Sequence, residues 1–278
     1  MILQARHQVA RLIVENPTAA SRSCPQRKRQ MFIFCFGMMR SGSTLQFQLV
    51  ARLVEAAGVG ERVPWTEPED FASCAASVRS DQRWRVFKAH WCNDAMRDEF
   101  VHHNARGVGI HRDLRDVMVS HADKYDKPIT PEHCRRFISQ CLESFSAWDG
   151  LPRTMITRYD ELTTDPVSVI TRMAEHLELP CTAQQAVALA REYSLAAQRE
   201  RIDRAQRTAV MQPAWSGGPT MMKDELLHED HIADGRTGKW THRFDAACRA
   251  AVDELAGDWL VQHGYERSSD FPPMDAGI

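Results

Sequence analysis

The feature of this sequence that most constrains its fold is an apolar run that ends in a glycine turn and resumes as a helix. Residues 31–36, MFIFCF, are rich in Phe and Ile and stop at Gly37, and apolar residues recur at helical spacing from Gln46 onward. A buried strand, a tight turn and a helix N-terminus aim backbone N–H groups and the positive end of the helix dipole at one point. The segment therefore predicts a binding site for a phosphate or sulfate group.

The turn departs from the commonest phosphate loop at its lysine. Gly37 and Gly42 have the spacing Gly-x-x-x-x-Gly, but Ser43 stands where the pattern of phosphate-loop NTPases has Lys. The positive charge lies earlier, at Arg40. The candidate anion-binding residues are Arg40, Ser41, Gly42, Ser43 and Thr44.

Composition excludes several classes of protein. The 278 residues suffice for one sizeable core, and 43% hydrophobic with 26% charged residues is ordinary for a globular protein. A net charge of −2 argues against a nucleic-acid or anionic-membrane partner, and no apolar run approaches the ~20 residues that span a bilayer. The eight cysteines are scattered without metal-ligand spacing, which predicts reduced thiols, no metal site and a cytoplasmic location.

Strand and helix patterns alternate along the chain. They predict an α/β fold, with a mostly parallel sheet flanked by helices, of the P-loop-containing nucleotide-binding kind. The expected strands are 31–36, 83–90, 107–111 and 154–159, and the expected helices are 46–57, 112–125 (after a turn), 131–148, 165–177, 184–207 and 245–263. The expected loops are 60–70 and 210–238, the second a candidate lid or substrate loop. We expect a poorly ordered N-terminal extension over 1–30, a single domain over 31–265 and a frayed C-terminal tail over 266–278.

Three further motifs follow the phosphate loop. Arg112 ends an expected strand and Ser120 comes eight positions later, on the following helix. Tyr159 ends another strand in the run Arg-Tyr-Asp-Glu-Leu, and the run Gly-Arg-Thr-Gly-Lys-Trp occupies 235–240. By themselves, the charges around Arg112 also suit a surface helix with paired side chains.

In this order the motifs resemble sulfotransferases that use 3′-phosphoadenosine-5′-phosphosulfate (PAPS), in particular the bacterial and carbohydrate-type members with an Arg-Ser-Gly-Ser loop. The resemblance covers most of the chain, from residue 37 to residue 244. It implies that Arg112 and Ser120 hold the 3′-phosphate and that Tyr159 lies near the adenine. It also implies that a C-terminal loop closes on the 3′-phosphate through Arg236, Thr237 and Gly238. Leu45 stands where cytosolic members have a Trp beside the adenine, so another group must cover the base.

The resemblance offers two candidates for the catalytic base. Lys88-Ala89-His90 matches the Lys-Thr-His of cytosolic members, whose His takes the proton of the acceptor and whose Lys lies near the transferred group. Glu67, in a Glu-Pro pair found in carbohydrate-type members, is the alternative. Imidazole suits proton removal near neutral pH, so His90 is preferred and Glu67 stays open. Arg40 and Lys88 are then expected to stabilise the leaving group.

The sequence thus predicts transfer of a sulfonate group from PAPS, without a metal, to a hydroxyl or less readily an amine of a small molecule or glycan. A kinase using ATP is the first alternative, but it requires a Lys in the loop and an Asp at a strand end for magnesium. A non-catalytic nucleotide-binding module is the second. The acceptor and the oligomeric state are not readable from the sequence.

Overall fold

A five-stranded sheet forms the centre of the computed structural model, which describes residues 30–208, 210–213, 220–228 and 235–271. The strand order is β2-β3-β1-β4-β5, and every neighbouring pair is parallel. The strands are β1 (Phe32–Gly37), β2 (Gly60–Arg62), β3 (Trp84–Ala89), β4 (Ala105–His111) and β5 (Thr154–Arg158). The fold class expected from the sequence is confirmed.

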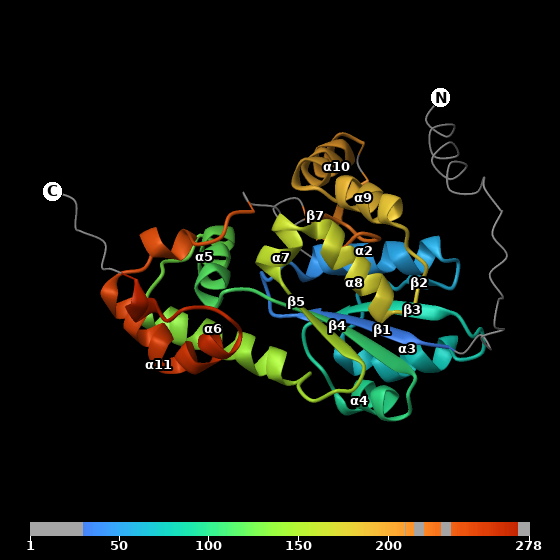
Figure 1. The fold of residues 1–278 in the computed structure, drawn as a ribbon, viewed down its shortest axis with the longest axis horizontal. Helices are drawn as coiled ribbons and strands as arrows, with labels where there is room; N and C mark the ends of the chain where they lie inside the picture. The colour runs from blue at the N-terminus through green and yellow to red at the C-terminus, as the bar shows by residue number, and fades with distance from the viewer. Residues whose placement is uncertain (1–29, 209, 214–219, 229–234, 272–278) are drawn as a thin grey trace.

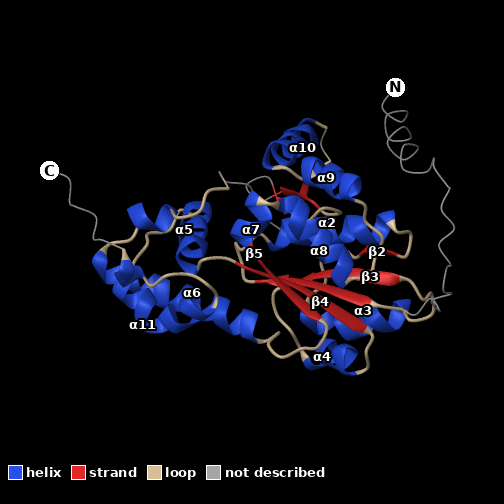
Figure 2. Cartoon of the chain, viewed as in Figure 1, coloured by secondary structure: helices blue, strands red, loops and turns tan. Residues whose placement is uncertain are grey.

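Helices cover both faces of this sheet (Figures 1 and 2). α2 (Ser43–Ala56) and α8 (Pro166–His176) lie on one face, and α3 (Phe71–Val78) and α4 (Asp94–Val101) lie on the other. The other helices are α5 (Leu114–Tyr125), α6 (Pro131–Ser146), α7 (Tyr159–Thr164), α9 (Ala183–Glu192), α10 (Leu195–Arg207) and α11 (Ala246–Gln262). α5, α6 and α11 gather beyond the sheet, at the left of Figure 1.

The alternation of side chains along β1 divides the core into two layers. Ile33 and Cys35 join the cluster beneath α2 and α8, while Phe32, Phe34 and Phe36 join the opposite one. All five side chains are at most 1% exposed. The apolar run that the sequence shows before Gly37 is therefore the central strand of the sheet, buried on both faces.

Two predicted segments differ from the structure. The expected loop 60–70 contains the edge strand β2, whose three residues include a Glu and an Arg and so lack a buried-strand pattern. The expected helix 184–207 is two helices, α9 and α10, because Ser194 caps a new start by accepting from the Ala197 N–H at 3.3 Å. The buried ring of Tyr193 anchors the break.

Two regions of predicted irregular structure are partly ordered. Within 210–238, the described residues form a small antiparallel sheet of β6 (Gln212–Pro213), β7 (Thr220–Met222) and β8 (Leu227–His228). At the start of the expected C-terminal tail, Ser268 and Ser269 donate their backbone N–H groups to Asp253 at 2.8 Å. The expected extension 1–30 lies outside the described residues except for Gln30, and the domain boundaries stay a prediction.

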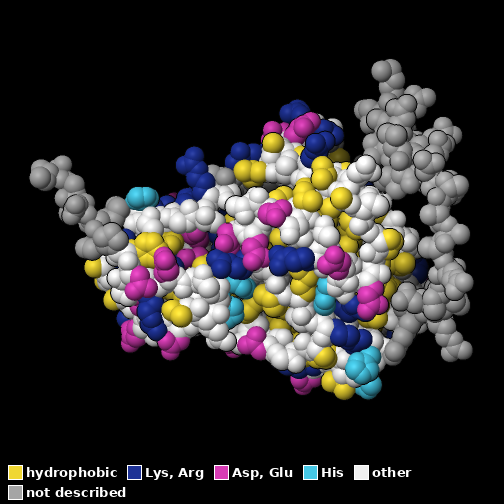
Figure 3. Space-filling model, in the orientation of Figure 1, with side chains coloured by type: hydrophobic (Ala, Val, Ile, Leu, Met, Phe, Trp, Pro, Cys, Tyr) yellow, Lys and Arg dark blue, Asp and Glu magenta, His cyan; other side chains and the backbone are white. Residues whose placement is uncertain are grey.

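Acidic and basic side chains alternate over the face shown in Figure 3, where dark blue and magenta groups lie next to one another. The described residues include surface ion pairs such as Arg158–Asp160 and Arg172–Glu161, at 2.8 and 2.6 Å. Within the part of the chain that is described, none of the helices has the length and apolar character needed to cross a membrane.

Candidate active site

A cavity of about 760 Å³ lies at the carboxyl edge of the sheet. Its wall includes Arg40, which follows β1, His90, which follows β3, Arg112, which follows β4, and Tyr159, which follows β5. Ligands of open α/β sheets bind at this edge because the strand-to-helix loops gather there. The structure thus brings motifs separated by more than a hundred residues into one cavity.

The phosphate loop has the backbone that an anion site needs. Gly42 precedes α2 with φ 90°, and no described side chain caps the helix there. Gly37 packs so closely on β4 that a Cβ atom would lie 2.6 Å from the Ile110 carbonyl oxygen. Arg40 also adopts a positive φ of 65°, a conformation that non-glycine residues rarely hold. The uncapped start of α2 faces the cavity through Gly42, Ser43 and Thr44.

Ser41 is placed differently from the other loop residues. Its side chain is fully buried, and its hydroxyl donates to the Met38 carbonyl at 2.7 Å. Its backbone N–H points to the same carbonyl at 3.3 Å. Ser41 therefore closes the turn, and Arg40, Gly42, Ser43 and Thr44 form the cavity wall.

The predicted 3′-phosphate residues meet the phosphate loop. The Nε of Arg40 donates to Ser120 Oγ at 3.1 Å, across 80 residues of sequence. Arg112 is 7% exposed, and one of its terminal nitrogens lies 3.5 Å from the Arg40 carbonyl. Its Nε is buried without a partner among the described residues. A buried cation with an unused donor indicates that the site is built to receive an anion.

The loop that follows residue 234 closes over Arg112. Arg112 donates to the Arg236 carbonyl at 2.7 Å, and its guanidinium lies 4.2 Å from the centre of the Tyr159 ring. The Tyr159 hydroxyl lies 3.5 Å from the Gly235 carbonyl. Gly235 belongs to the cavity wall, whereas the exposed residues Arg236, Thr237 and Gly238 lie outside it. The predicted loop is therefore at the site, but it meets Arg112 through the backbone carbonyl of Arg236.

Asp116 holds this loop in place and was not predicted from the sequence. Its carboxylate accepts the Gly238 N–H at 2.6 Å and the Trp240 N–H at 3.3 Å. Burial raises the pKa of Asp116, against the lowering effects of Arg112 and of these hydrogen bonds. The available signal was its position, four residues after Arg112 and four before Ser120, on one face of α5.

The second half of the cavity contains the candidates for proton transfer. The Nζ of Lys88 lies 5.1 Å from the centre of the Trp65 ring, and the Trp65 and His90 rings are 5.9 Å apart. The Trp65 indole N–H donates to Glu67 Oε1 at 2.7 Å. The two candidate bases and Lys88 thus surround one exposed tryptophan, which the sequence had not marked as a site residue.

His90 is held in a single orientation. Its Nδ1 lies 2.6 Å from the Gly37 carbonyl oxygen, which can only accept, so Nδ1 carries the proton and Nε2 keeps its lone pair. The backbone carbonyl of His90 accepts from the Trp148 indole at 3.2 Å. Burial, followed by the charge of Lys88, lowers the pKa of His90 to about 3. The imidazole is therefore neutral at neutral pH.

The surroundings of Lys88 also shift its pKa. Burial lowers its pKa to about 8, and the charges of Lys124 and Arg40 act in the same direction. An anion bound between these cations would favour the charged form of Lys88.

The cavity wall beyond Tyr159 is apolar, and it was not predicted from the sequence. Leu195, at the break between α9 and α10, lies against Gly235, where an added Cβ atom would be 3.4 Å from its Cδ2. Leu45 and Leu162 line the same cavity. Leu45 stands where the resemblance leads one to expect a Trp beside the adenine. The three leucines are therefore candidates for covering the base instead.

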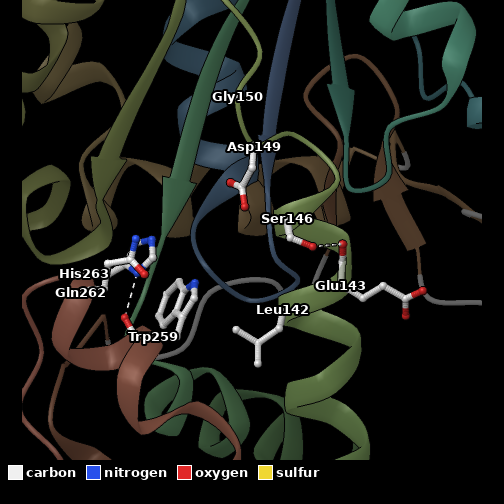
Figure 4. A pocket seen from close by; sticks show the side chains of 8 residues that line it. All are labelled: Leu142, Glu143, Ser146, Asp149, Gly150, Trp259, Gln262 and His263. Carbon is white, nitrogen blue, oxygen red and sulfur yellow. Dashed lines mark hydrogen bonds between the residues drawn. The ribbon is translucent and has the colours of Figure 1, made fainter.

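A second hollow, of about 530 Å³, lies between α6 and α11 (Figure 4). It is lined by Leu142, Glu143, Ser146, Asp149, Gly150, Trp259, Gln262 and His263. No predicted site residue borders it, and two of its polar groups, Ser146 Oγ and His263 Nδ1, bond to backbone carbonyls of their own helices. The described residues contain no group of three or more His, Cys, Asp or Glu side chains that is suited to hold a metal ion, here or elsewhere.

Comparison with known proteins identifies a family and a fold. The family model described as the sulfotransferase domain matches residues 32–264. Among solved structures, a mouse sulfotransferase complexed with PAP (adenosine 3′,5′-bisphosphate) matches with a TM-score of 0.60 and 14% identity, over 84% of each chain. A retinol dehydratase in complex with androsterone and PAP matches with a TM-score of 0.55 and 17% identity, over 85% of this chain and 82% of the other. The same kind of enzyme in a complex with retinol and PAP matches with a TM-score of 0.53 and 15% identity, over 84% and 82%. No curated protein sequence matches the chain.

Proposed function

The chain belongs to the sulfotransferase domain family, and from this premise we propose that its cavity binds PAPS and that its residues promote sulfonate transfer to a hydroxyl group. The family match and the PAP-bound structural neighbours favour this function over an ATP-dependent kinase and over a non-catalytic module. The residues that an ATP-dependent kinase requires are also missing from these positions. Ser43 replaces the loop lysine, and β4 ends in His111 instead of Asp.

The observation that carries the proposal is the convergence of Arg40, Arg112 and Ser120 at the uncapped start of α2. Arg40 binds Ser120 directly, and Arg112 lies against the Arg40 backbone with no partner for its Nε among the described residues. One nucleotide with phosphates at both its 5′ and 3′ positions would contact all three residues. ATP, which has no 3′-phosphate, would leave the Arg112 and Ser120 side of the site unfilled.

The residues of the cavity divide into those proposed to bind the donor PAPS and those proposed to take part in the transfer step. PAPS supplies an activated sulfonate whose leaving group is the 5′-phosphate of PAP. Arg40, Ser43, Thr44 and the N-terminus of α2 would bind this phosphosulfate. Arg112 and Ser120 would bind the 3′-phosphate, and the Tyr159–Leu195 wall would cover the base. Arg236 and Thr237 stay predicted contacts, with the Arg236 carbonyl as the group that meets Arg112.

We assign the base to His90. The Gly37 carbonyl fixes its tautomer, so that Nε2 is the proton acceptor. Glu67 would orient Trp65 through the indole N–H, as a positioning residue. Lys88, half-buried with a pKa lowered to about 8, would stabilise charge growing on the leaving phosphate and is able to donate a proton to it.

The acceptor belongs to the class of small molecules. Members of this fold have been solved with androsterone and with retinol, and a cavity of about 760 Å³ has room for a small acceptor beside the donor. A hydroxyl stays the expected nucleophile, and a neutral His90 would remove its proton at the moment of attack. A glycan acceptor stays a prediction.

The direct test is an assay of the purified protein with PAPS and a panel of hydroxylated small molecules. Mass spectrometry should detect acceptors that gain one SO₃ group, with an equal amount of PAP released. Arg112→Ala should abolish the product, while Arg136→Ala, on the neighbouring helix α6 and outside the cavity wall, should not. Turnover with ATP and magnesium, or equal activity in both variants, would refute the proposal.

A further inference from the structure

The cavity wall contains an imidazole, His121, to which the proposed reaction gives no role. It follows Ser120 on α5 and lines the cavity. Its ring stacks on Phe137 of α6, with ring centres 3.7 Å apart and planes at 28°, and meets His133 edge-on at 5.2 Å. These contacts fix the plane of the ring, so its two nitrogens have different surroundings.

The nitrogen Nδ1 of His121 is buried and has no hydrogen-bond partner among the described residues. The neighbouring His133 directs its own Nδ1 to the Pro128 carbonyl oxygen at 2.8 Å. A proton on Nδ1 of His121 would therefore be a buried donor without an acceptor, which folded proteins rarely keep. The proton belongs on Nε2, which is the nitrogen through which this ring can reach the cavity.

His121 is neutral at neutral pH. Burial, followed by the charges of His133, Arg40 and Arg136, lowers its pKa to about 4. A neutral imidazole has one N–H donor and one lone-pair acceptor. In His90 the Gly37 carbonyl takes the Nδ1 proton, which leaves the lone pair on Nε2. The two imidazoles of the cavity wall thus have opposite tautomers, one with an acceptor at Nε2 and the other with a donor there.

Arg40 places His121 beside the proposed position of the phosphosulfate. Its Nε donates to Ser120 Oγ at 3.1 Å, so the residue before His121 touches the arginine of the phosphate loop. The charge of Arg40 lowers the pKa of both His121 and Lys88, which indicates that the guanidinium lies near both side chains. Since Arg40 is proposed to bind the phosphosulfate, a donor on His121 is close to its sulfonate.

We infer that His121 donates a hydrogen bond from Nε2 to an oxygen of the transferred sulfonate and so holds the sulfur in line for attack. The inference rests on the proposed function and adds a residue to its site. In the transfer, the acceptor oxygen forms a bond to sulfur while the bond from sulfur to the bridging oxygen of the 5′-phosphate breaks. The hydroxyl proton passes to His90, the electron pair of the broken bond leaves with PAP, and His121 keeps its proton throughout.

The test compares the binding of PAPS and of PAP without an acceptor, so it needs no turnover. PAP has no sulfonate, and only PAPS can meet the His121 donor. His121→Phe keeps an aromatic ring against Phe137 but has no N–H. In this variant calorimetry should show the dissociation constant of PAPS rising about tenfold relative to that of PAP. His121→Gln, whose amide offers an N–H, should keep most of the wild-type ratio. His102→Phe, at an exposed position outside the cavity wall, is the matched control.

The protonated nitrogen of His121 can be measured without any ligand. Long-range ¹H–¹⁵N spectra of protein with ¹⁵N-labelled histidine distinguish the two tautomers and the charged ring, and the signals of His121 are those missing from His121→Phe. At pH 7 they should show the proton on Nε2, whereas the signals of His90 should show it on Nδ1.

Four results would overturn the inference. The first is an unchanged ratio of the PAPS and PAP dissociation constants in His121→Phe, and the second is an equal loss of affinity for both ligands. The third is a change in His121→Gln as large as in His121→Phe, and the fourth is a His121 ring that carries a proton on Nδ1 at pH 7. Absence of PAP binding in the wild type would instead refute the proposed function itself, whatever the tautomer of His121.

Discussion

At the scale of single residues, the orientation of His90 distinguishes it from Glu67. The Gly37 carbonyl belongs to the strand that carries the phosphate loop, so His90 is tied to that loop by a hydrogen bond of 2.6 Å. Glu67 is exposed and is engaged with the Trp65 indole. The proposed proton acceptor is thus held in one orientation by the backbone, while the Glu67 carboxylate is proposed to act through Trp65.

The first prediction concerns this division of roles. His90→Ala should reduce kcat by about 10²–10⁴-fold, the usual contribution of a general base, while the dissociation constant of PAP changes little. Glu67→Gln keeps an oxygen for the Trp65 indole and should retain most of the activity. Steady-state kinetics and PAP calorimetry measure both effects. Full turnover in His90→Ala would transfer the base role to Glu67.

The second prediction concerns the protonation of Lys88. In the ligand-free protein its pKa is lowered to about 8, so part of the population is neutral near pH 8.5. A bound bisphosphate favours the ammonium form and raises this pKa, so PAP binding at pH 8.5 should take up as much as one proton per site. Cys35, which pairs with Lys88 in the register of β1 and β3, opposes the lowering by burial, Lys124 and Arg40, but it is fully buried and lies outside the cavity wall.

Calorimetry in two buffers of different ionisation enthalpy measures this uptake directly. The uptake should disappear in Lys88→Met and should shrink in the wild type at pH 6.5, where Lys88 is already charged. Binding without proton exchange at pH 8.5 would show that Lys88 does not face the ligand.

At the scale of elements, α5 joins the two halves of the site to the closing loop. Asp116 on its first turn accepts the backbone N–H groups of Gly238 and Trp240, and Arg112 just before the helix binds the Arg236 carbonyl. The 3₁₀ turn Lys239–His242 starts where this carboxylate caps it. The loop is therefore held against the donor site by backbone contacts rather than by a side chain of its own.

The third prediction follows from this anchoring. Asp116→Ala leaves two N–H groups unpaired and should weaken PAP binding about tenfold, or ~1.4 kcal/mol, which lies within the ~1–3 kcal/mol that a lost hydrogen bond to a charged group costs. Hydrogen exchange of residues 235–242 should accelerate in the same variant. Asp126→Asn, at the exposed end of α5, is the control. Unchanged exchange and affinity in Asp116→Ala would contradict the anchoring role.

Local patterns determined which elements the sequence could predict. β1 and α2 are encoded by an uninterrupted apolar run and by helical spacing, and Asp165 with Pro166 marks the start of α8 as predicted, with Asp165 capping Ser168 at 3.2 Å. β2 was not predicted, because an edge strand of three residues, two of them charged, has no periodicity. The break at Ser194 was not predicted, because the sequence has a helical pattern on both sides of it.

The same distinction applies to the site. Arg40, Arg112 and Ser120 could be named because each lies in a local motif. Asp116, Trp65 and Lys124 could not, because their surroundings depend on contacts with segments 23 to 122 residues away. Ser41 belonged to the correct motif, but its orientation depends on the turn it closes.

At the scale of the whole molecule, the proposed donor site is assembled from the ends of three parallel strands, β1, β4 and β5, and a loop near the C-terminus. No two neighbouring motifs complete it alone, and a ligand with phosphates at both ends of its ribose would link them. The central claim is therefore that one cavity recognises a nucleotide bearing both a 5′- and a 3′-phosphate.

Calorimetric titration of the protein with PAP, and separately with ATP and magnesium, tests that claim most directly. We predict saturable one-to-one binding of PAP, no measurable binding of ATP, and strongly weakened PAP binding in both Arg40→Ala and Arg112→Ala. Preference for ATP, or PAP affinity unchanged in both variants, would contradict the account and restore the kinase alternative.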